Sequence, residues 1–157
     1  MKFKIFGVLA AMLITLSSSL FAQDAATVSD EELKKYAIAM DSINELQAVL
    51  AGTIKTMVTT NTAVPATRYN ELYKIINDEN KLMEANATFD EIRFVKEVIA
   101  KRDEGTAKIK ETYQLLAKEY VGASSFNKVK KALAADESLK SKYQSMMDEL
   151  GKDNAVN

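Results

Sequence analysis

The sequence contains no cysteine, no histidine and no tryptophan, and only one proline and five glycines in 157 residues. The absence of cysteine and histidine excludes Ser-His-Asp and Cys-His nucleophiles, zinc sites of the Cys and His type, and di-iron sites built on Glu-x-x-His pairs. It also excludes disulfide bonds and the cysteine that a bacterial lipoprotein needs for lipid attachment. Neither a Gly-rich phosphate loop nor an Asp-x-Asp-x-Asp-Gly calcium loop occurs. We therefore expect no catalytic residue, no cofactor and no metal site.

A strong charge of either sign is also lacking, because 21 lysines and arginines stand against 22 aspartates and glutamates. A nucleic-acid-binding domain usually carries a basic excess, so we expect no nucleic acid as a partner. The plentiful residues, among them alanine, glutamate, lysine, leucine and methionine, are strong helix formers. Composition alone therefore predicts an all-α protein.

The first 22 residues have the three parts of a secretory signal peptide. Lys2 and Lys4 precede an apolar run over residues 5–16. A Ser-rich segment follows this run and precedes Ala22, the small residue of the expected cleavage site. The run has 12 residues, fewer than the ~20 that span a bilayer, although an uncleaved membrane anchor is the alternative. We predict cleavage after Ala22 and an exported protein, periplasmic or secreted. We also expect that it is not a lipoprotein and that its mature chain has no transmembrane segment.

Two capping boxes mark the starts of long helices. Ser29 and Glu32 form the first box, and Thr88 and Glu91 form the second. Apolar residues then recur every three or four positions, which predicts one buried face for each helix. The first helix is expected to bury a seam of Leu33, Tyr36, Met40, Ile43, Gln47, Leu50, Ile54 and Met57. The third helix is expected to bury Ile92, Val95, Ile99, Arg102, Thr106, Ile109, Tyr113, Leu116 and Tyr120.

These patterns predict an antiparallel bundle of about four helices, the last of them broken near Asp136. The second helix is expected to begin between Ala63 and Arg68, after a Thr-rich break that contains Pro65, and to end near Glu84. The third keeps its register across Gly105, so we predict one long helix there; two helices broken at Gly105 are the alternative. The predicted parts of the chain are a signal peptide at 1–22, a flexible lead at 23–28, a helical domain at 29–151 and a frayed tail at 152–157.

Arg102 and Tyr113 are the candidate ligand-binding residues, because both fall on the predicted seam of the third helix. A buried arginine can bind a carboxylate ligand through two parallel hydrogen bonds. It can instead reach solvent or pair with an acid of another helix, for which Glu79 is the candidate. Tyr113 belongs to a set of seam tyrosines whose hydroxyls either line a polar cavity or sit at the rims of a core: Tyr36, Tyr113, Tyr120 and Tyr143.

The segment Ser29-Asp30-Glu31-Glu32-Leu33, followed by Tyr36 and Ala37, resembles the opening of a family of exported bacterial helical proteins called domain of unknown function 4168. The end of the chain resembles the same family through Phe126-Asn127-Lys128-Val129, Ala132-Leu133, Asp136, Leu139 and Tyr143. Glu137 stands where that family often has proline. The resemblance covers the two ends of the mature chain and implies an exported helical protein, with no known activity, substrate or site residue.

The leading hypothesis is a non-enzymatic binding or interaction module of the cell envelope, whose partner is an unknown envelope protein or a small ligand. The first alternative is a small exported helical enzyme similar to periplasmic chorismate mutase. Such an enzyme clamps its substrate with cationic side chains, and the arginines available for this role are Arg68, Arg93 and Arg102. The second is a holdase-type chaperone whose adaptable surface includes Met57, Met83, Met146 and Met147. An enzyme needs a pocket with converging charges, whereas a holdase needs an exposed apolar groove.

Overall fold

The computed structural model describes residues 27–154, so the predicted signal peptide, most of the predicted lead and residues 155–157 lie outside the described residues. Within that range the regular secondary structure is entirely helical, which confirms the all-α prediction. The expected count of about four helices is not confirmed, since residues 27–154 hold six α-helices. The elements are α1 Asp30–Thr60, α2 Ala66–Ile75, α3 Glu79–Glu84, α4 Phe89–Leu115, the π-helix η1 Leu116–Tyr120, α5 Ala123–Ala135 and α6 Glu137–Asn154.

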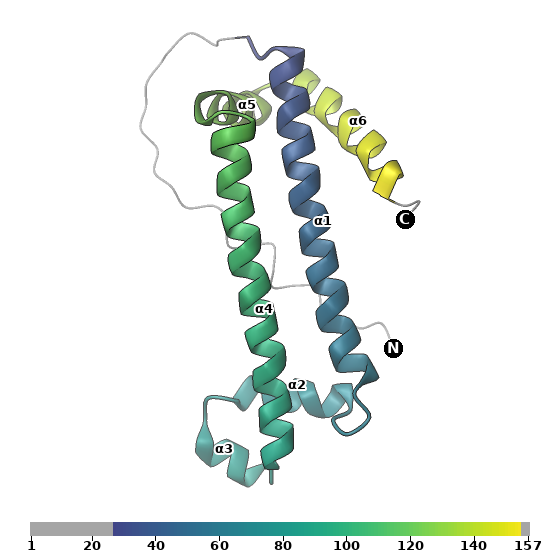
Figure 1. The fold of residues 1–157 in the computed structure, drawn as a ribbon, viewed down its shortest axis with the longest axis vertical. Coiled ribbons are helices and arrows are strands. Elements are labelled where there is room, and N and C mark those ends of the chain that lie inside the picture. Colours follow the sequence, from purple (N-terminus) through teal and green to yellow (C-terminus); the bar gives the residue numbers. More distant parts are fainter. Residues whose placement is uncertain (1–26, 155–157) are drawn as a thin grey trace.

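Two long helices form the main axis of the molecule. α1 and α4 lie side by side and run in opposite directions (Figure 1). α2 and α3 lie at one end of this pair, and η1, α5 and α6 lie at the other end. Both long helices begin as predicted, because the Ser29–Glu32 and Thr88–Glu91 capping boxes are complete. Each box supplies partners for backbone N–H groups that the first turn of a helix leaves unpaired.

The prediction of one helix that begins between Ala63 and Arg68 and ends near Glu84 is wrong, because this segment forms two helices, α2 and α3. The cause is Asp78, whose side chain accepts a hydrogen bond from the backbone N–H of Lys81 at 3.1 Å and caps α3. Aspartate competes with the helix for backbone donors in this way and is favoured at caps. The last helix also differs from expectation, since α6 continues past Gly151 to Asn154.

The core is divided into two clusters, one at each end of the α1–α4 pair. The α2 cluster comprises the buried residues Val58, Val64, Tyr69, Leu72, Ile76, Leu82, Val95 and Val98. The α5 cluster comprises the buried residues Leu33, Tyr36, Ala39, Val121, Phe126 and Val129. Burial of such side chains stabilises the fold by roughly 25 cal/mol for each Å² of apolar surface removed from water. Between the two clusters, the stability of the pair depends on how closely α1 and α4 pack against each other.

Gly105 lets the two long helices approach closely in the middle of the pair. α4 is continuous through this residue, as the retained register predicts. A methyl group at position 105 would lie 2.4 Å from Cδ1 and 2.8 Å from Cδ2 of Leu50, so the leucine side chain occupies the space over the glycine. The glycine therefore does not break the helix; it forms the hole into which Leu50 of α1 packs.

The π-helix η1 changes the register at the end of the third predicted helix. The backbone N–H of Val121 donates to the carbonyl of Leu116 at 2.9 Å, a step of five residues in place of the usual four. Val121 is therefore buried in the α5 cluster, whereas Tyr120 has 43% of its surface exposed. The expectation that Tyr120 lies on the buried seam is wrong for this reason.

Candidate functional site

Arg102 lies on α4 beside α2, and 35% of its side chain is exposed. Its Nε and Nη2 donate to Oδ1 of Asp103 at 3.0 and 2.8 Å, and its Nη1 donates to the Tyr73 hydroxyl. The guanidinium carbon is also 5.7 Å from the centre of the Tyr73 ring, within the range of a cation–π interaction. The predicted partner, Glu79, is not among these contacts, because the break at Asp78 places it in a separate helix. Arg102 therefore pairs with an acid, but with its own neighbour in the chain.

Tyr113 lies in different surroundings, against the aromatic rings of the α5 cluster. Its ring centre is 5.5 Å from that of Phe126 in a T-shaped contact. Partial burial raises the pKa of its hydroxyl. Tyr113 is 11 residues beyond Arg102 on α4, which corresponds to about 16 Å along the helix. The structure therefore does not bring the two candidate residues together into one site.

Two of the four seam tyrosines, Tyr36 and Tyr113, contact Phe126, and a third, Tyr143, contacts Tyr36. The ring centre of Tyr36 is 4.8 Å from that of Phe126 and 5.8 Å from that of Tyr143. Burial raises the pKa of Tyr36 to about 12, and the nearby phenols of Tyr143 and Tyr113 act in the same direction. Each such aromatic pair contributes roughly 0.5–1.5 kcal/mol beyond its area burial. These tyrosines therefore hold α1, α4, α5 and α6 together at this end of the molecule.

An ion pair that the sequence does not predict joins α2 to the start of α4. Arg68 donates from Nε and Nη2 to the two carboxylate oxygens of Glu91 at 2.8 and 3.2 Å, and from Nη2 to the Ala85 carbonyl at 2.9 Å. Glu91 also accepts the backbone N–H of Thr88 at 2.8 Å as part of the capping box. Hydrogen bonding from Arg68, followed by that from the Thr88 N–H, lowers the pKa of Glu91 to about 2.

An equivalent arrangement stands at the start of α1. Glu32 accepts the ammonium of Lys128 at 2.7 Å, the backbone N–H of Ser29 at 2.9 Å and the hydroxyl of Ser125 at 2.9 Å. Hydrogen bonding from Lys128 is the largest cause that lowers the pKa of Glu32 to about 2. Each long helix therefore starts with a glutamate that caps the helix and also binds a neighbouring helix.

The three arginines do not converge on a shared pocket. Arg68 and Arg102 are each held by the carboxylates described above. Arg93 is 58% exposed on α4, where it pairs with Asp90 at 2.8 Å and with Glu97 at 3.9 Å. Each guanidinium is therefore engaged by its own acid. A cationic clamp on an anionic substrate requires guanidinium groups that point into a common space, and these three side chains do not make that arrangement.

The four methionines of the holdase hypothesis are also dispersed. Met57 packs against the α2 cluster and Met146 against the α5 cluster. Met83 is 69% exposed on α3, and Met147 lines an open depression between α1 and α6. An adaptable apolar surface needs these side chains to form one patch. Here they are divided between the two ends of the molecule.

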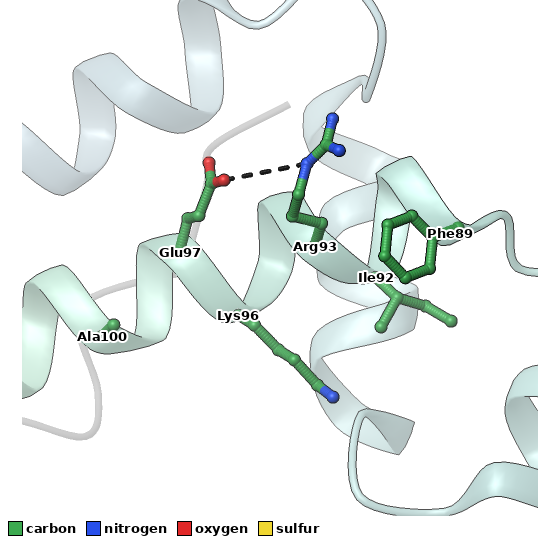
Figure 2. Close-up of a pocket in the computed structure, with 6 residues that line it drawn as sticks. All are labelled: Phe89, Ile92, Arg93, Lys96, Glu97 and Ala100. Atoms are coloured by element: carbon green, nitrogen blue, oxygen red, sulfur yellow. Dashed lines mark ion pairs between the residues drawn. The ribbon is translucent and has the colours of Figure 1, made fainter.

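The two most exposed large apolar side chains of residues 27–152 flank the turn from α3 to α4. Phe89 is 77% exposed and Met83 is 69% exposed. Phe89 also lines an open depression on α4, together with Ile92, Arg93, Lys96, Glu97 and Ala100 (Figure 2). The side chains of Phe89 and Ile92 lie next to each other in Figure 2, and the Arg93 guanidinium carbon is 5.9 Å from the centre of the Phe89 ring. We call the six residues that line this depression the α3–α4 surface.

A scan against protein-family models, a search of curated proteins and a search of solved structures found no match. The resemblance of both chain ends to an exported bacterial family therefore stays a prediction. Within residues 27–154, no group of three or more acidic, histidine or cysteine side chains is placed to hold a metal ion. No helix in this part of the chain is both long enough and apolar enough to cross a membrane.

Proposed function

We propose that this chain is exported through residues 1–22 and acts in the periplasm, or after secretion, as a non-enzymatic interaction module. The positively charged start, the apolar run and the small residue Ala22 support export. We also propose that the helices form an antiparallel bundle in which α1 and α4 are the long members. This bundle is a rigid support that presents a binding surface to another envelope protein.

The observation that carries the proposal is the exposure of Phe89. A phenylalanine that is 77% exposed on the first turn of a helix keeps a large apolar surface in water. Met83, which is 69% exposed, lies on the other side of the same turn. Aromatic residues and arginine are among the types enriched in protein–protein interfaces, and both occur in the α3–α4 surface. A protein partner that covers this surface gains the apolar burial that the isolated chain lacks.

The arrangement of charged residues favours a protein partner over a small anionic ligand. Arg102 and Tyr113 lie in separate surroundings, so they do not form a two-sided ligand site. Arg68 is engaged by a carboxylate and a backbone carbonyl. A small anion would therefore have to displace an acid that is already in place, at the cost of leaving that carboxylate without its partner.

Processing of the N-terminus tests the export part of the proposal. Protein recovered from the periplasm or medium of an expressing host is expected to begin at Gln23, because Ala22 fits the small-residue rule for cleavage. Intact mass and N-terminal sequencing measure the start. The control, Ala22→Asp, is expected to block cleavage. Wild-type protein that retains residues 1–22 in the membrane fraction would contradict export and release.

Site-specific photo-crosslinking tests the binding surface. A photoreactive phenylalanine analogue at position 89 is expected to give a discrete higher-mass adduct in living cells, because Phe89 lies within the α3–α4 surface. The matched control places the same analogue at Gln114, which is exposed near the other end of α4. Equal labelling at the two positions, or no adduct at position 89, would remove the support for this surface.

A further inference from the structure

Among the α-helices of residues 27–154, α6 is attached through partly buried side chains only. Each of the other five α-helices has at least one buried side chain, whereas α6 has none among its residues up to 152. Leu139, Tyr143 and Met146 pack against the α5 cluster but remain half-buried. The ion pair of Lys142 with Asp30, at 2.5 Å, has side chains that are 45% and 81% exposed, so water and salt screen it strongly.

The second half of α6 also leaves an open space beside α1. The two helices diverge toward the C-terminal end of α6 (Figure 1). A depression lies between them, and Met147 of α6 and Ala48 of α1 are among its lining residues. Met147 is half-buried as a result. Contact with α1 and α5 is therefore the main attachment of α6, and it is concentrated in the first half of the helix.

A single residue, Asp136, separates α5 from α6. Its backbone is extended, with φ −119° and ψ 109°. Its N–H donates to Ala132 and its carbonyl accepts from Lys140, both four-residue steps of the kind an uninterrupted helix makes. Its carboxylate accepts the N–H groups of Ser138 and Leu139. If Asp136 adopted helical backbone angles, α5 and α6 would become one continuous helix, and backbone hydrogen bonds would replace these two capping bonds.

We call the form in which α5 and α6 make one continuous helix the straightened state. In this state α6 cannot reach the α1 of its own chain. The rings of Tyr36 and Phe126, which Tyr143 and its neighbours partly cover, would lose that cover and expose apolar surface to water. A second copy of the chain supplies an α6 with the same apolar seam and the same lysine opposite Asp30. Two straightened copies can therefore cover each other by reciprocal exchange about a two-fold axis.

We propose that α6 is an exchangeable helix, and that its seat on α1 and α5 accepts the α6 of a second copy to form a domain-swapped dimer. The seat lies at the opposite end of the molecule from the α3–α4 surface, so this proposal is independent of the proposed function. Formation of the dimer leaves the α3–α4 surface free in both copies.

The absence of cysteine makes exchange directly measurable. Asp30→Cys and Lys142→Cys are introduced into separate preparations, which are mixed, concentrated, warmed and oxidised. Exchange places the two cysteines together across the dimer and is expected to give a disulfide-linked pair of chains. The control mixture, Asp30→Cys with Lys74→Cys on α2, measures random collision. The double variant Asp30→Cys, Lys142→Cys measures how readily the two positions are bridged within one chain, and the yield of linked chains is compared with that value.

Two variants of the hinge test the same proposal without disulfides. Asp136→Ala removes the cap and favours a continuous helix, so the dimer fraction measured by light scattering is expected to rise roughly tenfold. Glu137→Pro keeps residue 136 out of the helical region and is tolerated at the first position of α6, so this variant is expected to stay monomeric. Linked chains no more abundant than in the collision control, together with equal dimer fractions in the two hinge variants, would overturn the proposal.

Discussion

Replacing Ile43 with alanine is expected to lower the free energy of unfolding by about 2–5 kcal/mol. Ile43 is 3% exposed in the middle of the predicted α1 seam, so the substitution removes buried methylene groups and leaves a cavity. Denaturant titration followed by circular dichroism measures the change as a shift in midpoint at constant slope.

Ile109→Ala is the matched comparison, because the same chemical change is made in the middle of α4. The sequence alone predicts an equal loss, since both isoleucines lie on seams of the two longest helices. Both isoleucines lie outside the two core clusters, but Ile109 is only half-buried whereas Ile43 is 3% exposed, so the loss at Ile109 is expected to be smaller. A third variant, Ser29→Ala, removes the α1 cap and is expected to cost about 1 kcal/mol. An order in which Ile43→Ala is the mildest of the three would contradict the assignment of the core.

The features that could be predicted from the sequence are those that depend on neighbouring residues. The boxes at Ser29 and Thr88 each need residues within one turn, and both are present as predicted. Continuity of α4 through Gly105 also followed from the local register. In contrast, the partner of Glu32 is Lys128, 96 residues away, and helix periodicity contains no information about which helices become neighbours.

The errors have identifiable physical causes. Apolar periodicity continued across Asp78, so it concealed a break that the capping side chain of this residue produces. The π-helix inserted one extra residue into a turn, which moved Val121 to the buried position expected for Tyr120. The sequence does not mark Phe89 as a surface residue, because it follows the Thr88 cap and lies off the seam that starts at Ile92. The one feature of the sequence that points to its exposure is that this aromatic residue does not fit the periodic apolar pattern.

The ion pair between Arg68 and Glu91 leads to the second large expected effect. Glu91→Gln keeps a hydrogen-bonding side chain but removes the charge that Arg68 binds through two oxygens. The Arg68 and Glu91 side chains are only 24% and 17% exposed, and the acid that would remain near Arg68 is Glu71, which is 66% exposed and lies 3.5 Å from Nη1. The partly buried guanidinium therefore loses its closer and better-buried counter-ion. We expect a loss of about 1–3 kcal/mol in the free energy of unfolding at neutral pH.

The pH dependence of this loss identifies its cause. The folded-state pKa of Glu91 is about 2, below the value of 4.5 for an unperturbed glutamate. The unfolded chain therefore takes up the proton first as the pH falls, so the contribution of Glu91 is fully present above pH 4.5 and is lost between pH 4.5 and 2. The difference in stability between wild type and Glu91→Gln is expected to shrink across this range.

Glu97→Gln is the matched control, because Glu97 lies on the same helix, is 60% exposed and approaches Arg93 only to 3.9 Å. Exposed pairs of this kind contribute little, so we expect a change within about 0.5 kcal/mol and no marked pH dependence. Chemical denaturation of the three proteins at several pH values between 2 and 7 measures both effects. If Glu91→Gln and Glu97→Gln behaved alike at neutral pH, Glu91 would act only as a helix cap, and the attachment of α2 to α4 would depend on the apolar α2 cluster alone.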